Sequence, residues 1–209
     1  MLSKFLFLDS NTCNLCKEEF IYGYGLCKSC FDKLDYVDNE FLIGTFKTHV
    51  MYFYDEFFKR LIGLYKFERK TEFSRIFSKM VYDYGIGKNL FDTDYILPAP
   101  SSKKTLIKRG FDHIRMITDD FIGEIKPVYL DDFKKIKDTK AQHDLGRDER
   151  AVNLKDAFYL DRDLTGKSVL IIDDLITTGS TSLEIIKTLE GKNVRDIKIL
   201  ALASERRVL

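Results

Sequence analysis

The sequence predicts an α/β protein, a parallel β-sheet flanked by helices, preceded by a small four-cysteine module. The main observation is the stretch Ser168–Glu184, SVLIIDDLITTGSTSLE, in which a β-branched run is followed by two acids, a hydroxyl-rich loop and an apolar pattern at helical spacing. A second apolar run, Asp94–Pro100, ends in prolines as a strand does. All four cysteines lie in the first thirty residues. We therefore expect a cysteine module over residues 1–40 and the α/β domain over residues 41–209.

Charge and hydropathy exclude some classes of protein. Among 209 residues, 34 are Lys or Arg and 33 are Asp or Glu, so no strong overall field attracts the chain to nucleic acid or an anionic membrane. Any such binding depends on local patches. No apolar run is long enough to span a bilayer, and the N-terminal FLFL is too short for the core of a signal peptide. We therefore expect a cytoplasmic protein without membrane insertion.

The cysteines form two CxxC pairs separated by ten residues, Cys13 with Cys16 and Cys27 with Cys30. In an intracellular chain this pattern predicts one tetrahedral, structural Zn²⁺ site that stabilises a module too small to fold alone. Two disulfides would require an oxidising compartment that nothing else in the sequence supports. A redox-active CxxC pair would not need a second copy.

The segment that follows the cysteines reads as structural core. Phe41–Tyr54 mixes aromatic and β-branched residues and predicts one or two strands at the sheet edge. Apolar residues at spacings of three and four predict one helix over Phe57–Phe67 and another over Glu72–Tyr84, with Gly85 as the cap. We assign no chemistry to these stripes.

The strand Asp94–Pro100 is followed by an abruptly basic loop, and Phe111–Phe121 then reads as a helix. Small and basic residues just past a strand end suit contact with a pyrophosphate or a nucleic-acid backbone, since Arg can bind such oxygens through two donors. A solvated basic loop is the alternative. The candidate residues are Ser101, Ser102, Lys103, Lys104, Lys108 and Arg109.

The charge-mixed segment Lys135–Phe158 looks like an exposed loop that could fold over a ligand, with His143 more typical of a surface histidine than of a catalytic one. Asn153–Tyr159 reads as a short strand before the central motif. Asp196–Ala203 supplies a last strand.

The central motif carries the chemistry. Asp173 and Asp174 follow the predicted strand Val169–Ile172, at the sheet edge where open α/β sheets bind ligands. The next loop would surround a phosphate with backbone N–H groups, hydroxyls and the positive end of a helix dipole, and its residues are Thr177, Thr178, Gly179, Ser180 and Thr181. Because carboxylates repel phosphate, the two acids suit sugar hydroxyls instead. Together they predict a ribose 5-phosphate site, against the alternative of an ordinary turn with a Ser or Thr N-cap.

The loop is not a Walker loop, because it contains no Gly-Lys-Ser/Thr sequence. It is not a GxGxxG dinucleotide loop either. It resembles the signature of type I phosphoribosyltransferases, which bind phosphoribosyl pyrophosphate (PRPP). In that family the paired acids take the ribose hydroxyls and the loop takes the 5-phosphate. The resemblance thus implies a phosphoribosyltransferase-like sheet, with Asp173 and Asp174 on the ribose and Thr177–Thr181 on the phosphate.

Four segments in order resemble ComF-type competence proteins, a branch of this fold. The first is the double CxxC, the second is LPAPSSKKTLIKRGFDHI and the last is the IIDDLITTGST motif. The third lies between the second and the last, and it is the pattern Gln142, Leu145, Arg150, Asn153 and Phe158. The sequence has Asp112 and His113 where the family has Asn and Gln, so no role is carried over to those two positions.

The resemblance implies a factor of natural transformation that handles incoming single-stranded DNA, with a helicase-like competence protein and the inner-membrane DNA channel as partners that could recruit it to that membrane. It also implies PRPP, bound with Mg²⁺. The basic segments Lys103–Arg109, Arg147–Arg150 and Arg206–Arg207 could contact DNA phosphates. The alternative function is a Mg²⁺-dependent phosphoribosyltransferase acting on a nucleobase or amine. No segment is recognisable as an acceptor pocket, which favours a ligand-binding domain.

Overall fold

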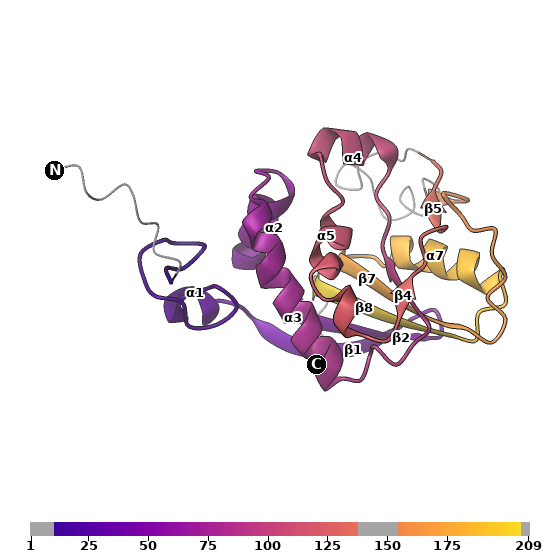
Figure 1. The fold of residues 1–209 in the computed structure, drawn as a ribbon, viewed down its shortest axis with the longest axis horizontal. Coiled ribbons are helices and arrows are strands. Elements are labelled where there is room, and N and C mark those ends of the chain that lie inside the picture. Colours follow the sequence, from indigo (N-terminus) through magenta and orange to yellow (C-terminus); the bar gives the residue numbers. More distant parts are fainter. Residues whose placement is uncertain (1–10, 138–153, 206–209) are drawn as a thin grey trace.

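The computed structural model describes residues 11–137 and 154–205. Its main sheet has the strand order β1-β2-β8-β7-β3-β4, and β5 and β6 form a separate pair (Figure 1). The strands are β1 (Tyr36–Ile43), β2 (Phe46–Phe53), β3 (Tyr95–Pro98), β4 (Val128–Tyr129), β5 (Lys134–Lys135), β6 (Phe158–Tyr159), β7 (Ser168–Ile176) and β8 (Asp196–Ser204). Strands β2, β8, β7, β3 and β4 run parallel, and β1 is antiparallel to β2. The predicted α/β class is confirmed.

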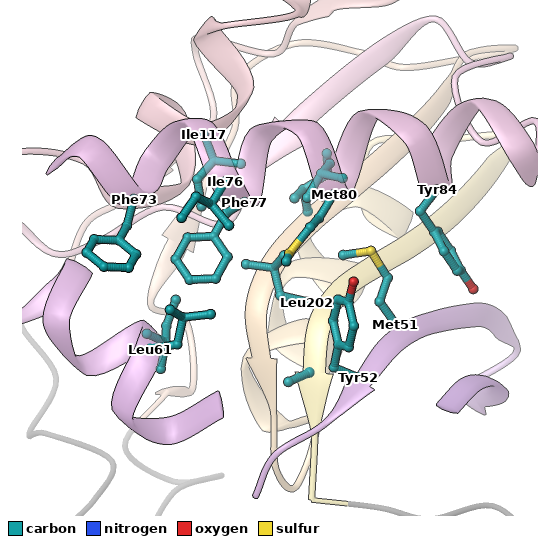
Figure 2. Close-up of a cluster of buried hydrophobic side chains, with 14 of the residues drawn as sticks. Met51, Tyr52, Leu61, Phe73, Ile76, Phe77, Met80, Tyr84, Ile117 and Leu202 are labelled. Atoms are coloured by element: carbon teal, nitrogen blue, oxygen red, sulfur yellow. The ribbon is translucent and has the colours of Figure 1, made fainter. Parts of the chain in front are cut away.

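Helices cover both faces of the main sheet. The helices of the described residues are α1 (Lys28–Phe31), α2 (Glu56–Lys66), η1 (Thr71–Phe73), α3 (Ser74–Gly87), α4 (Lys103–Arg109), α5 (His113–Asp119), η2 (Ile122–Glu124) and α7 (Ser180–Glu190). On one face, α2, α3 and α5 belong to the same buried cluster as Leu170 and Ile172 of β7. Figure 2 shows part of this cluster, with Leu61, Phe77 and Ile117 of the helices and Leu202 of β8. On the other face, α7 packs against Val169 and Ile171. This alternation follows from the two-residue repeat of a strand.

The predicted edge strands are β1 and β2, a hairpin at the margin of the sheet. Because β1 begins at Tyr36, the expected domain boundary at residue 40 falls inside this strand. Cys13, Leu26 and Cys27 of the cysteine module are fully buried and belong to the same apolar cluster as α3. The division into two domains stays a prediction.

The helix predicted over Glu72–Tyr84 consists of η1 and α3, and the prediction that Gly85 caps it is wrong. Gly85 lies inside α3, and the helix ends at Gly87 with Lys88 as its C-cap. A Cβ atom on Gly85 would lie 2.3 Å from Cζ of Phe91. The glycine therefore lets the aromatic ring pack directly on the helix backbone.

Two further expectations differ from the structure. The basic segment after β3 is the short helix α4 rather than a loop, because the Ser102 side chain accepts a hydrogen bond from the Thr105 N–H and caps it. The strand expected over Asn153–Tyr159 contains only Phe158 and Tyr159 among described residues, and it pairs with β5. Gln142, His143, Leu145, Arg150 and Asn153 lie outside the described residues, as do Arg147 and the Arg206–Arg207 pair.

Within residues 11–137 and 154–205, none of the helices combines the length and the apolar character needed to cross a bilayer.

Candidate functional site: a crevice between β3 and β7

The strand order reverses between β3 and β7, and we call the place at the carboxyl edge of the sheet where the loops after these two strands begin the crevice. Strand β3 leads to β4 on one side, whereas β7 leads to β8 on the other. Pro98 of β3 pairs with Ile172 of β7, and the Ala99 N–H donates to the Ile172 carbonyl oxygen over 2.8 Å. The loops that follow β3 and β7 therefore flank one point. Open α/β sheets bind ligands at such a switch point.

The loop after β7 has the shape that an anion site requires. Gly179 has φ +81° and is the N-cap residue of α7, and as a glycine it has no side chain of its own to cap this helix. The Ser180 N–H donates to Oγ1 of Thr178 over 3.3 Å, and the two hydroxyl oxygens lie 2.8 Å apart. Asp173 and this loop line a small, largely polar hollow. The loop thus directs N–H groups and the positive helix end toward a small polar cavity.

The two adjacent acids of β7 face opposite sides of the sheet. Asp173 lines the hollow of the loop, on the face of Ile171 and α7. Asp174 points the other way, on the face of Ile172, and contacts α2 and α5. Strand β7 continues past both acids, with Asp173 paired to Ala201 and Leu175 paired to Ala203, and Oδ1 of Asp173 accepts a hydrogen bond from the Asp174 N–H over 2.9 Å. Only Asp173 lies beside the predicted phosphate loop.

A buried polar network holds Asp174. Lys66, the last residue of α2, ion-pairs with its Oδ2, and Nε2 of His113 lies 3.4 Å from its Oδ1. On the other side of the ring, Arg109 Nη1 donates to His113 Nδ1 over 2.5 Å. Nδ1 is therefore the acceptor, and the imidazole proton belongs on Nε2, toward the carboxylate. The Tyr65 hydroxyl donates to the His113 carbonyl oxygen over 2.7 Å and fixes the start of α5.

These surroundings separate the pKa values of the two acids. Burial opposes ionisation of Asp174, but Lys66 and then His113 outweigh it and hold the pKa of Asp174 well below its usual range. Burial, together with the charge of Asp174, raises the pKa of Asp173 well above its usual range. Burial also lowers the pKa of His113, so the ring is neutral beside Asp174. Asp174 is thus compensated within the protein, whereas Asp173 has no cationic group within ion-pair distance among described residues.

The basic candidates divide into two groups. Lys103, Lys104 and Lys108 are exposed on α4. Arg109 is half-buried and turned inward to His113, and burial lowers its pKa against the pull of Asp174. Ser102 is buried as the N-cap of α4, and Ser101 lies beside it in the loop after β3.

A lysine-lined groove of about 910 Å³ runs between α4 and β5. Lys103 contributes from α4, and Lys134, Lys135 and Lys137 contribute from the β5 segment, over an apolar floor that includes Leu106. Lys103 and Lys134 have no carboxylate within 4 Å in the part of the chain that the structure describes. The groove therefore presents positive charge next to the crevice.

This geometry agrees with what the chain is similar to. Residues 114–207 match the family model for a phosphoribosyl transferase domain. Over these residues the chain is similar to a phosphoribosyl transferase domain. It is also homologous to "Competence protein F" of Haemophilus influenzae, with 27% identity over 199 residues, which are 91% of this chain and 83% of the relative. "DNA utilization protein YhgH" of Escherichia coli K12 is 26% identical over 147 residues, 68% of this chain and 65% of the relative.

Among solved structures, the purine phosphoribosyltransferase of Pyrococcus horikoshii is 20% identical to this chain, with a TM-score of 0.37 over 64% of this chain and 77% of that chain. The matched phosphoribosyl transferase domain begins at Ile114 in α5 and includes the acids and loop of β7. The cysteine module, β3 and α4 precede the matched residues. The competence-protein relative is matched over nearly the whole chain.

The cysteine module lies outside this domain, and its thiols converge. The Sγ atoms of Cys13, Cys16, Cys27 and Cys30 all lie within 4.8 Å of one another, and those of Cys16 and Cys27 are 3.7 Å apart. Tetrahedral zinc with Zn–S bonds of about 2.3 Å needs sulfur atoms about 3.8 Å apart. None of the four forms a disulfide. Burial opposes ionisation of Cys13, but hydrogen bonds from the backbone of Cys16 and Cys27 lower its pKa to about 6. The cluster fits zinc.

Sequence reasoning missed two members of the site, Lys66 and His113. Lys66 ends a helix whose residues were read as core, and a single lysine there gives no local signal. His113 did carry a signal, because it departs from the ComF-type pattern and follows Arg109 by four positions.

Proposed function

We propose that the crevice between β3 and β7 binds PRPP together with Mg²⁺. The observation that carries this proposal is the hydroxyl loop of Gly179, which leads into the start of α7 beside Asp173, an acid with no ion-pair partner among the described residues. A phosphate would accept hydrogen bonds from Thr177–Thr181 and from the first N–H groups of α7. This loop has no lysine of its own, so the proposed 5-phosphate would rely on hydrogen bonds and the helix dipole.

The two acids have different proposed roles in the ribose site. Asp173 would accept hydrogen bonds from the ribose hydroxyls, because it faces the loop and lacks an ion-pair partner within the described residues. Asp174 would keep β7 and α5 in register around the site through Lys66 and His113. The proposed ribose end thus consists of one ligating acid and one positioning acid.

Mg²⁺ fits the donor set of the proposed site, because this ion prefers oxygen ligands and retains part of its water. Asp173 would hold it next to the ribose oxygens and the pyrophosphate. When bound, the ion supplies charge neutralisation to pyrophosphate. The binding of Mg²⁺ would also favour the ionised form of Asp173, whose pKa is raised in its absence. The loop after β3, with Ser101, and the inward-turned Arg109 would approach the pyrophosphate from the opposite wall.

We further propose that the protein handles single-stranded DNA in natural transformation, in the cytoplasm, with a helicase-like competence protein and the DNA channel as partners. The names of the relatives in Haemophilus influenzae and Escherichia coli support a role in DNA utilisation. The groove with Lys103 and Lys134 offers positive charge for a DNA backbone. If it holds phosphates, the affinity for an oligonucleotide should fall steeply between 50 and 200 mM salt, on the order of tenfold for each one to two phosphates neutralised. A flat salt response would contradict phosphate contacts.

Phosphorus NMR tests the PRPP site. The zinc-loaded protein is mixed with PRPP and Mg²⁺, first alone, then with a panel of nucleobases and amines, and then with single-stranded DNA. Shifted PRPP signals without pyrophosphate release support a ligand-binding domain. Release that depends on one acceptor would identify a phosphoribosyltransferase and its substrate. Unshifted signals at saturating PRPP would contradict the proposal.

A further inference from the structure

A second cavity lies where the cysteine module meets the sheet, and none of its lining residues belongs to the loops of the crevice. It has a volume of about 730 Å³. Tyr24 and Phe31 of the module form one wall, and Tyr36 of β1, Tyr52 of β2 and Tyr84 of α3 form the rest. Figure 1 shows the module at one end of the molecule, next to β1 and α3. We call this cavity the junction pocket.

The walls of the junction pocket are rings and sulfur atoms. The rings of Tyr24 and Phe31 are 5.9 Å apart, and those of Tyr36 and Tyr52 meet edge to face at 5.6 Å. Met51 of β2 and Met80 of α3 complete the buried floor, close to Tyr52 and Tyr84 (Figure 2). Rings and thioethers together favour a flat aromatic ligand.

The pocket also offers one donor and one acceptor. Tyr52 is only 5% exposed and lines the pocket, so its hydroxyl group can donate a hydrogen bond to a ligand there. Asp83 lies at the opening, where its charge helps to raise the pKa of Tyr24, after burial of that ring.

A pocket with one donor, Tyr52, and one acceptor, Asp83, favours a neutral heteroaromatic ring over a cation as its ligand. A cationic side chain has donors only, so the Tyr52 hydroxyl could accept a hydrogen bond from it but could not donate one to it. The charge of Asp83 is also partly balanced, because Lys79 lies 3.4 Å away. A nucleobase edge carries both donors and acceptors, and it stacks on any aromatic face.

The aromatic surface continues outward from the pocket. On the cysteine module, Phe20 and Tyr22 are 74% and 61% exposed. Lys28 Nζ lies 5.1 Å from the centre of the Tyr22 ring. Rings interleaved with lysines are typical of surfaces that bind single strands by base stacking.

We propose that the junction pocket binds one base of a single-stranded nucleic acid, stacked on the tyrosine rings, with Tyr52 donating to the base and Asp83 accepting from it. This inference rests on the DNA-handling part of the proposed function and assigns it a surface away from the PRPP crevice. It also gives the cysteine module a task, because that module holds Tyr24 and Phe31 in place.

The chain contains no tryptophan, so Tyr36→Trp places a single fluorescent reporter at the pocket mouth. Addition of a 20-nucleotide single strand to this zinc-loaded variant should quench the tryptophan, whereas an abasic strand of equal length should not. Tyr36→Ala and Asp83→Asn should each weaken oligonucleotide binding, measured by fluorescence anisotropy. The loss should be about fivefold or more for Tyr36→Ala, which removes a stacking ring. Tyr52→Phe, which removes only the hydroxyl, should weaken binding about two- to tenfold. Tyr159→Ala, an exposed tyrosine of β6, is the matched control.

The outcomes separate this inference from the rest of the proposed function. If the wild-type protein binds the oligonucleotide and the pocket variants bind it equally well, the junction pocket is not the base site. Absence of any oligonucleotide binding would overturn both the pocket and the DNA-handling role, while PRPP binding by NMR would stand independently. Quenching by an oligo-arginine peptide instead of the oligonucleotide would show a cation site and would also overturn the proposal.

Discussion

In the buried centre of the molecule, Nε2 of His113 lies 3.4 Å from Oδ1 of Asp174, while Lys66 holds the other carboxylate oxygen. The preceding residue, Asp173, faces the hydroxyl loop on the other side of the sheet. Two adjacent acids of one motif therefore have different environments. One is compensated by the protein, and the other is available to a ligand.

Single substitutions should separate these two acids. Asp173→Asn should abolish PRPP binding and change the free energy of unfolding little, because the fold already disfavours the charge on Asp173. Asp174→Asn should destabilise the protein by roughly 3–5 kcal/mol, because Lys66 would remain buried without its partner. Calorimetry with PRPP and Mg²⁺ and urea unfolding measure the two effects, with the exposed Asp161→Asn as control. Equal stability losses in both variants would contradict the division of roles.

Stability should depend on pH through His113. Its pKa is lowered in the folded protein, so below the ordinary value near 6.5 the unfolded chain binds a proton that the folded chain does not. The contribution of His113 is thus complete above pH 6.5 and is lost as the pH falls, with a slope of at most about 1.4 kcal/mol per pH unit.

His113→Gln keeps a donor for Asp174 but does not titrate. The difference in unfolding free energy between the wild-type protein and this variant should therefore shrink as the pH falls from 7 to 5. Asp173, whose raised pKa acts in the opposite sense, is present in both proteins and cancels in this comparison. A difference that is constant with pH would show that His113 does not titrate in this range.

The loop glycine should not tolerate a side chain. Gly179→Ala requires φ +81° from a residue with a Cβ atom, which would lie 3.2 Å from Cδ1 of Ile43. We expect a loss of about 1–2 kcal/mol in unfolding free energy and weaker PRPP binding. Gly123→Ala, with no atom within 4 Å of the added carbon, should change neither quantity. Full PRPP affinity in Gly179→Ala would argue against a role of this loop in phosphate binding.

Replacing two helix glycines, Gly85 and Gly63, with alanine should change the stability of the protein in opposite directions. Gly85→Ala places a Cβ atom 2.3 Å from Cζ of Phe91 and should cost about 1–3 kcal/mol, because the ring must move. Gly63→Ala in α2 meets no atom within 4 Å and should stabilise the protein by up to about 1 kcal/mol. Thermal or urea unfolding measures both, and a neutral Gly85→Ala would show that Phe91 repacks freely.

Metal content should depend on the four thiols together. Cys13→Ser should release zinc, counted by elemental analysis, and expose the module to protease, because this cysteine is fully buried at the centre of the cluster. Ser29→Ala, between Lys28 and Cys30, removes an exposed hydroxyl bound to Glu19 and should retain one zinc per chain. Full zinc content in Cys13→Ser would contradict a four-cysteine site.

Local patterns in the sequence determined much of this protein. The β-branched run before Asp173 predicts β7, the apolar stripes predict α2 and α3, and the spacing of the cysteines predicts their convergence. The hydroxyl-rich loop after the acids predicts the turn into α7, where Gly179 has φ +81°. These features depend on residues that are neighbours in the chain, so their physical causes can be read from a few positions at a time.

Only the tertiary structure decided how the pieces meet. Lys66 and Asp174 are 108 positions apart, and their pairing depends on the packing of α2 against the sheet. The opposite directions of Asp173 and Asp174 follow from strand pairing that continues to Ile176, beyond the apolar run. The junction pocket likewise draws its walls from the cysteine module, β1, β2 and α3. Long-range packing sets these relationships, because burial and ion pairing join residues whose separation along the chain carries no local signal.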